Sequence, residues 1–93
     1  MTWKFSEPPN MAVITFSAIL DGSEEITFVS HDADDGSWQF LGSSEIDETN
    51  AMVVSLHSMV ELDSTISELA DLPLGWHARR ESLSGQWQRG ANL

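Results

Sequence analysis

The sequence has no cysteine and no long hydrophobic stretch. Without cysteine, this chain of 93 residues can form neither a disulfide framework nor a thiolate zinc site, and it has no cysteine nucleophile. A reducing, cytoplasmic environment fits this composition. Apolar runs such as Met11–Ile14 are four residues long, far shorter than a membrane-spanning helix or the apolar part of a secretory signal. We therefore expect no association with a membrane.

Basic residues are also scarce. Four Lys and Arg stand against 15 Asp and Glu, so the formal net charge is −11, and residues 5–78 contain no Lys or Arg. Such a field repels nucleic acid and anionic lipid, whereas it attracts basic proteins. The charge predicts a basic protein partner and no direct binding of nucleic acid. A second interpretation is that the charge only keeps a small domain soluble.

The chain does contain enough apolar side chains for one hydrophobic core. Its apolar share of 41% is too high for a disordered chain, and 93 residues suffice for one core but not for two. We predict a single domain over residues 1–93. In this domain, residues 1–10 form an N-terminal arm, residues 11–89 a compact body, and residues 90–93 a frayed tail.

The residue pattern predicts an α+β fold with a small, mainly antiparallel sheet and two short helices packed on one face. Segments rich in β-branched and aromatic residues predict strands over residues 12–16, 25–31, 37–42, 51–55, 76–81 and 86–89. Asp35-Gly36 marks a hairpin turn, and the strand at 51–55 is expected to be buried. From Leu56 onward apolar residues recur at helical spacing, and Asp63 is placed to cap a second helix before residue 72.

Several short motifs occur in a recognisable order. They are Ile19-Leu20-Asp21-Gly22, Val29-Ser30-His31-Asp32, Asp35-Gly36-Ser37-Trp38-Gln39-Phe40, Val53-Val54-Ser55-Leu56 and Asp71-Leu72-Pro73-Leu74-Gly75-Trp76-His77-Ala78-Arg79-Arg80. Over roughly residues 12–89 the chain resembles a bacterial family long labelled a domain of unknown function and grouped, mainly from gene neighbourhoods, with immunity proteins of polymorphic toxin systems. The resemblance implies a small α+β binding protein, with an immunity role by analogy and no catalytic residues to transfer.

Candidate metal sites do not have the required spacing. If Gly36 takes the sixth position of an EF-hand loop, the first, third and twelfth positions fall on His31, Ala33 and Gly42, none of which supplies a carboxylate. No two of the three histidines, His31, His57 and His77, are four residues apart. We therefore expect no metal and no cofactor.

Catalytic motifs are absent as well. No serine lies in a G-x-S-x-G context, and no glycine-rich phosphate loop is present. With 15 acids in the chain, some carboxylates must lie close together, so a close pair of carboxylates does not indicate general acid–base catalysis. We expect a protein that is not an enzyme. The alternatives from other classes are a small metal-dependent hydrolase built on His31, Asp32, Asp34 and His77, and an accessory domain that forms a homodimer through a sheet edge.

The predicted partner-binding residues are acids with aromatic anchors. The acids form two loop groups, Asp32, Asp34 and Asp35 in the first and Glu45, Asp47 and Glu48 in the second. Trp3 and Trp87 flank the body and are candidate anchors, since aromatic side chains often dominate protein interfaces. Trp38 and Trp76 lie within the recognisable motifs and are expected in the core.

The expected function follows from this surface. We expect an inhibitory, immunity-type protein that masks a basic site on a toxin or effector protein. The alternative is a phage-type anti-defence inhibitor that imitates nucleic acid, which would also bind a basic site through an acidic surface. Arg79 and Arg80 are expected to pair with acids of the domain itself, because four bases are too few for a nucleic-acid interface.

Overall fold

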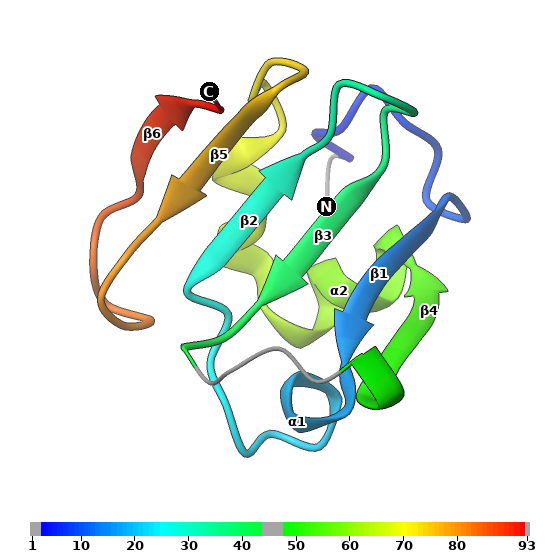
Figure 1. Ribbon diagram of the computed structural model, residues 1–93, viewed down its shortest axis with the longest axis vertical. Helices are drawn as coiled ribbons and strands as arrows, with labels where there is room; N and C mark the ends of the chain where they lie inside the picture. Colours follow the sequence, from blue (N-terminus) through cyan, green and yellow to red (C-terminus); the bar gives the residue numbers. More distant parts are fainter. Residues whose placement is uncertain (1–2, 44–47, 93) are drawn as a thin grey trace.

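The computed structural model describes residues 3–43 and 48–92, which form one six-stranded sheet with short helices (Figure 1). The strands are β1 (Ala12–Phe16), β2 (Phe28–His31), β3 (Trp38–Leu41), β4 (Ala51–Ser55), β5 (Trp76–Arg79) and β6 (Gln88–Ala91), in the spatial order β4-β1-β3-β2-β5-β6. Only the β1–β3 pair is parallel among these described strands, and the other neighbours are antiparallel. The predicted α+β fold with a mainly antiparallel sheet is confirmed.

Two hairpins form where the local sequence predicts them. In the first, β2 pairs with β3, and the connecting turn is closed by the Asp32 N–H, which donates to the Ser37 carbonyl at 2.8 Å. Gly36 in this turn has a φ of 73°, a left-handed conformation that glycine adopts without steric cost. In the second hairpin β5 pairs with β6. β5 ends two residues earlier than the predicted strand at 76–81, and β6 begins two residues later than the predicted strand at 86–89.

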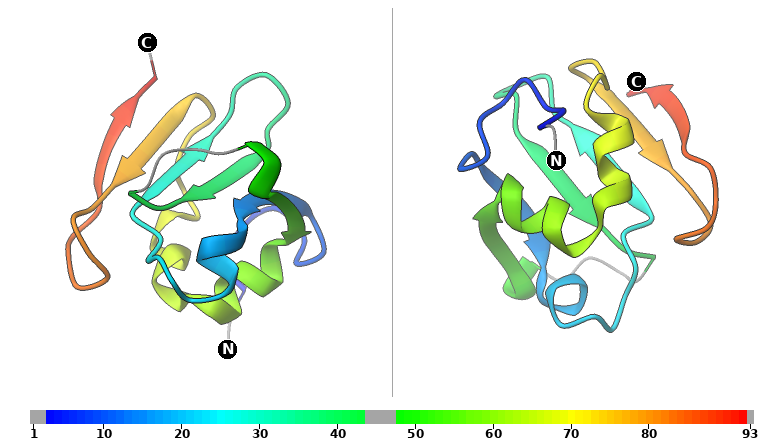
Figure 2. Two further views of the ribbon diagram at one scale, coloured as in Figure 1. Left: turned by 60° about the horizontal axis from the view of Figure 1, so that its bottom comes forward. Right: turned by 180° about the vertical axis from the view of Figure 1, so that it is seen from behind.

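The helices are short, and α2 and η2 begin at side-chain caps. The structure contains α1 (Ser17–Leu20), the 3₁₀ helix η1 (Glu48–Asn50), α2 (Leu56–Leu62) and the 3₁₀ helix η2 (Ser64–Leu69). The Ser55 hydroxyl accepts from the Ser58 N–H at the start of α2, and the Asp63 carboxylate accepts from the Thr65 N–H at the start of η2. The two predicted helices between residues 56 and 72, with Asp63 between them, are confirmed. Seen from behind in Figure 2, α2 and η2 lie in front of the strands.

The core consists of alternate side chains of the strands together with apolar residues of the helices. The buried set comprises Phe5, Val13, Ile19, Ile26, Val29, Trp38, Phe40, Leu56, Met59, Val60, Ile66, Leu69, Leu72 and Ala78. Trp38 and Phe40 point to the same face of β3 and have nearly parallel rings, with centroids 6.2 Å apart. Thr15 is also buried, and its hydroxyl donates to the Phe40 carbonyl at 2.8 Å, so no polar atom of this side chain is left unpaired.

The two chain ends take part in this fold. Phe5, from the segment expected to form an arm, is buried and packs edge-on against Trp38, with ring centroids 5.2 Å apart. At the other end, Gly90 and Ala91, expected in a frayed tail, belong to β6, and the Asn92 N–H donates to the Gly75 carbonyl at 2.7 Å. No helix in the described part of the chain is long and apolar enough to cross a membrane.

Two burial predictions are wrong. Residues 51–55 were expected to form a buried strand, but β4 is the terminal strand of the sheet, and Val53 is 71% exposed. Trp76 was expected in the core, but it opens β5 at the rim of the sheet and is 36% exposed. In both cases the residue type favours burial, whereas the place of the residue in the sheet decides the exposure.

Candidate functional site

The first predicted acidic group lies in the turn between β2 and β3. The Asp32 carboxylate accepts from the Ser30 hydroxyl at 2.6 Å and from the Gln39 amide at 2.7 Å. The Asp35 carboxylate accepts from the Ser37 N–H at 2.9 Å. Asp34 and Asp35 are both exposed. Asp32 and Asp35 therefore shape the hairpin through these hydrogen bonds, whereas Asp34 makes no such bond within the described residues.

This turn borders an open hollow at the rim of the sheet. The hollow is lined by Asp32, Ala33, Asp34, Asp35, Gly75 and Asn92. The neighbouring turn is held against the hairpin by the Gly75 N–H, which donates to the His31 carbonyl at 2.7 Å. Leu74 is exposed next to it, as is Trp76. The rim thus combines acids with two exposed apolar side chains, of which Trp76 was not predicted as a surface residue.

The second predicted acidic group is only partly described. Glu45 and Asp47 lie outside the described residues, and Glu48 is placed only as the first residue of η1. The partner-binding role of this group stays a prediction.

The two predicted aromatic anchors, Trp3 and Trp87, are half-buried and pack against the core. The Trp3 indole N–H donates to the Glu7 carbonyl at 2.7 Å, and its ring lies 5.8 Å from the Phe5 ring. The Trp87 ring is covered by the guanidinium of Arg80, 4.1 Å from the ring centroid. Both rings make contacts within the domain, and their role in binding a partner is still a prediction.

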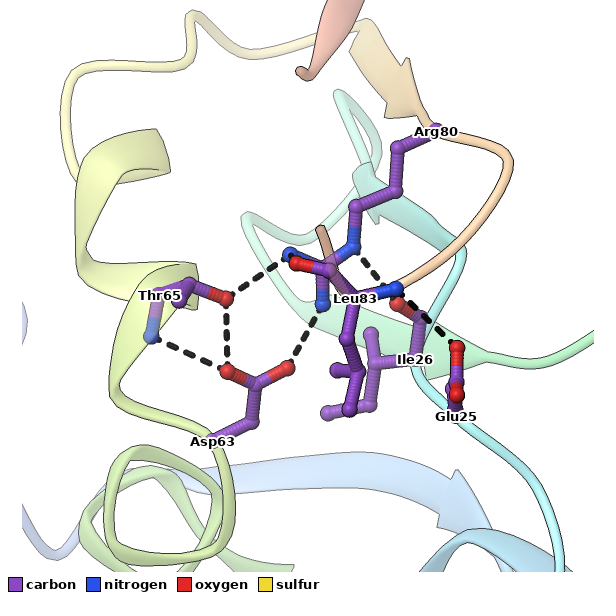
Figure 3. A network of polar contacts seen from close by, with 6 residues as sticks. All are labelled: Glu25, Ile26, Asp63, Thr65, Arg80 and Leu83. Atoms are coloured by element: carbon purple, nitrogen blue, oxygen red, sulfur yellow. Dashed lines mark hydrogen bonds and ion pairs between the residues drawn. The ribbon is translucent and has the colours of Figure 1, made fainter. Parts of the chain in front are cut away.

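Arg80 is the centre of a buried polar network that joins three parts of the chain (Figure 3). Its Nη2 forms an ion pair with the Asp63 carboxylate at 2.6 Å, and its Nη1 donates to the Thr65 hydroxyl at 2.8 Å. Its Nε donates to the Ile26 carbonyl at 3.0 Å, and Nη1 also reaches the Leu83 carbonyl at 3.4 Å. The predicted pairing of Arg80 with an acid of the domain is confirmed. The network is structural, because it fixes η2 and the β5–β6 loop to the segment before β2.

The remaining basic residues differ in exposure. Arg89 forms an ion pair with Asp71 at 2.8 Å, and the hydrogen bond and positive charge of Arg89 hold the pKa of Asp71 below its ordinary value. Arg79 and Lys4 are exposed, and among the described residues neither forms an ion pair. The predicted pairing of Arg79 with an acid is therefore not found in the described structure.

The three histidines lie in separate environments. His31 is buried, with its ring stacked on Trp38 at 3.9 Å, and its two nitrogens face the Leu72 carbonyl at 2.8 Å and the Glu7 carboxylate at 3.3 Å. The same carboxylate accepts from the Trp38 indole N–H at 2.8 Å. Glu7 was not predicted as a site residue. It lies far along the chain from His31 and Trp38, so no local sequence pattern indicates these contacts.

The other two histidines are nearer the surface. His57 faces Glu61 one helical turn later at 3.2 Å, and His77 contacts the Asn92 side chain at 2.8 Å. His31 and His77 do not converge with Asp32 and Asp34 in the manner that the hydrolase alternative requires. Within residues 3–43 and 48–92, no group of three or more His, Cys, Asp or Glu side chains could hold a metal ion.

Comparison with known proteins adds no family assignment. No family model matches the chain, and neither a curated protein nor a solved structure matches it. The resemblance to the immunity-associated family therefore remains a prediction from the sequence motifs.

Proposed function

We propose that this chain is an acidic, non-enzymatic binding protein of the immunity type, which masks a basic site on a toxin or effector protein in the cytoplasm. The observation that carries the proposal is the distribution of charge. The net charge is −11, and two of the four basic side chains, Arg80 and Arg89, are held in ion pairs with acids of the same chain. Little positive charge is left to offset the negative field that a basic partner encounters.

The rim of the sheet supports this function with local chemistry. The hairpin acids, foremost Asp34, border an open hollow, and Leu74 and Trp76 are exposed beside it. Protein interfaces combine such an apolar anchor with a polar surround. Trp76 therefore joins Trp3 and Trp87 as a candidate anchor, and it is more exposed than either.

The proposal includes the packing of α2 and η2 on one face of the sheet. In this arrangement the helices do not cover the β2–β3 turn that carries the hairpin acids. A partner can then reach the hairpin acids without displacing a helix. This arrangement agrees with the view from behind in Figure 2.

The test uses the tagged protein as bait in a lysate of its native host, followed by binding kinetics with the purified partner. We expect a basic partner whose association rate falls at least about tenfold between roughly 50 and 500 mM salt, while its dissociation rate changes much less. Asp34→Lys should slow association. Glu81→Lys is the matched control, since it makes the same charge change at an exposed residue beyond the opposite end of β5.

Two results would contradict the proposal. An association rate that does not depend on salt would show that the acidity serves only solubility. If Glu81→Lys slowed association as much as Asp34→Lys, the rim would have no special role, and only the net charge would matter.

A further inference from the structure

The outer edge of β4 is unpaired in the described structure. β4 is the terminal strand, and its five residues pair in continuous register with β1, from Ala51 opposite Phe16 to Ser55 opposite Ala12. A regular edge strand of this kind presents a row of free backbone N–H and C=O groups. Within the described residues, β4 has no strand partner on its outer side.

The edge also lacks the usual features that prevent strand addition. Natural edges are commonly protected by charged side chains, proline or bulges. β4 has none of these, and residues 49–60 contain no Asp, Glu, Lys or Arg, although 20% of the chain is charged. The opposite edge, β6, is shorter and contains Arg89 and Gly90. The unprotected β4 edge is therefore better suited than the β6 edge to pair with an added strand.

Apolar side chains are exposed on both faces of β4. Val53 is 71% exposed and Met52 is 43% exposed. Consecutive residues of a strand point to opposite faces, so Val53 extends the surface next to Ile14, and Met52 lies next to Thr15 on the other face. A strand added to this edge would cover both side chains at once.

The three arginines lie on the other side of the sheet from this edge. Arg79 ends β5, Arg80 follows it, and Arg89 lies in β6. Lys4 lines a hollow together with Ser67, Glu68, Ala70 and Asp71, on the η2 side. β4 is separated from β5 by three strands, so a cationic segment approaching β4 does not meet the three arginines.

We propose that β4 accepts an extended segment of a partner protein as a seventh strand, apolar and β-branched at its centre and carrying Lys or Arg at its ends. Main-chain hydrogen bonds would give the segment its affinity, and contacts with Val53 and Met52 its preference for apolar residues. A second copy of the chain is disfavoured, because each copy has a net charge of −11. The sign of the flanking charges rests on the proposed function, whereas strand addition rests on β4 alone.

The experiment titrates the ¹⁵N-labelled protein with a synthetic probe peptide of alternating valine and threonine with two lysines at each end. We expect saturable shifts and slowed amide exchange at residues 51–55, and no such change at residues 88–91. A control peptide of the same sequence, N-methylated at both alternating sets of amides, has no N–H donor on either edge. It should bind at least roughly tenfold more weakly than the unmethylated probe, a loss of about 1.4 kcal/mol.

Variants of the protein give an independent readout. Val53→Lys should weaken probe binding at least roughly tenfold, because it places a charge on the edge and repels the lysines. Gln88→Lys makes the same charge change at an exposed residue of β6 and should leave binding nearly unchanged. Because Val53 is largely exposed, we expect the variant to retain its circular dichroism spectrum.

Different failures have different meanings. Equal binding of the methylated control and the unmethylated probe, the absence of saturable binding, or shifts confined to residues 32–36 would overturn strand addition. The last result would leave the proposed function intact. A wild-type dimer that Val53→Lys converts to a monomer would overturn the choice of partner. If a peptide with glutamates at its ends bound β4 equally well at all salt concentrations, strand addition would stand and the electrostatic function would fail.

Discussion

Replacing Asp63 with alanine should strongly destabilise the domain, because the Arg80 guanidinium would stay buried without its counter-ion. The Arg80 side chain is 1% exposed and the Asp63 side chain 10%. Removing one partner of such a buried ion pair typically costs about 3–5 kcal/mol. The same carboxylate caps η2 through the Thr65 N–H, and losing a cap costs about 1 kcal/mol. Since one group makes both contacts, we expect a total loss of about 4 kcal/mol.

This loss is large for a domain of this size. Small domains are stable by about 5–15 kcal/mol, and each kcal/mol corresponds to roughly 4–8 °C in the melting temperature of a domain of 60–100 residues. The Asp63→Ala variant should therefore melt roughly 15–30 °C below the wild type. Urea unfolding followed by tryptophan fluorescence measures the free energy, and calorimetry measures the melting temperature.

Two further variants separate the causes. Asp63→Asn keeps an oxygen that can accept from the Thr65 N–H but removes the charge, so its loss should fall between the wild type and Asp63→Ala. Asp71→Ala breaks the ion pair between Asp71 and Arg89, which is similar in length to the Asp63–Arg80 pair. Because the Asp71 side chain is 80% exposed, this substitution should lower the free energy of unfolding far less than Asp63→Ala. If Asp63→Ala lowered the free energy of unfolding no more than Asp71→Ala does, the assignment of the network as structural would be wrong.

Three smaller effects follow from other contacts. Ser55→Ala removes the cap of α2 and should cost about 1 kcal/mol in urea unfolding. Gly22→Ala should cost about 1–2 kcal/mol, because Gly22 has a φ of 85° while space for a methyl group is open. Arg89→Gln should raise the pKa of Asp71, measured by NMR titration. Because the folded pKa is lowered in the wild type, this pair stabilises above the unfolded pKa of about 3.9, and that stabilisation is lost as pH falls through the folded value.

Local sequence chemistry predicts the turns and the caps. Asp35-Gly36 specifies the β2–β3 hairpin, because glycine takes the left-handed conformation and the Asp carboxylate accepts a nearby backbone N–H. Asp63 marks the boundary between α2 and η2 for a similar reason, since its carboxylate caps the following turn. These features depend on residues within a few positions of one another, so they can be predicted from one sequence.

Features that depend on strand order could not be predicted. The apolar run in β4 has the composition of a buried strand, and nothing within it specifies that it pairs on one side only. Likewise, the contacts of Glu7 with His31 and Trp38 join residues far apart in sequence. Exposure of Trp76 follows from its position at the start of β5. Such properties arise only once the whole sheet is assembled.

Acidic side chains in this protein have two different tasks, so the net charge overstates the number of acids available to a partner. Asp32 holds Ser30 and Gln39 through hydrogen bonds, and Asp34 is exposed in the same hairpin. Reversing the charge of Asp32 would therefore remove both a structural contact and a surface charge, whereas Asp34→Lys changes the surface charge alone. If the hairpin binds by electrostatic attraction, the two variants should slow association to a similar degree, but only the Asp32 variant should also lower the melting temperature. If only the Asp32 variant associated more slowly, the cause would be misfolding of the hairpin rather than the loss of its negative charge.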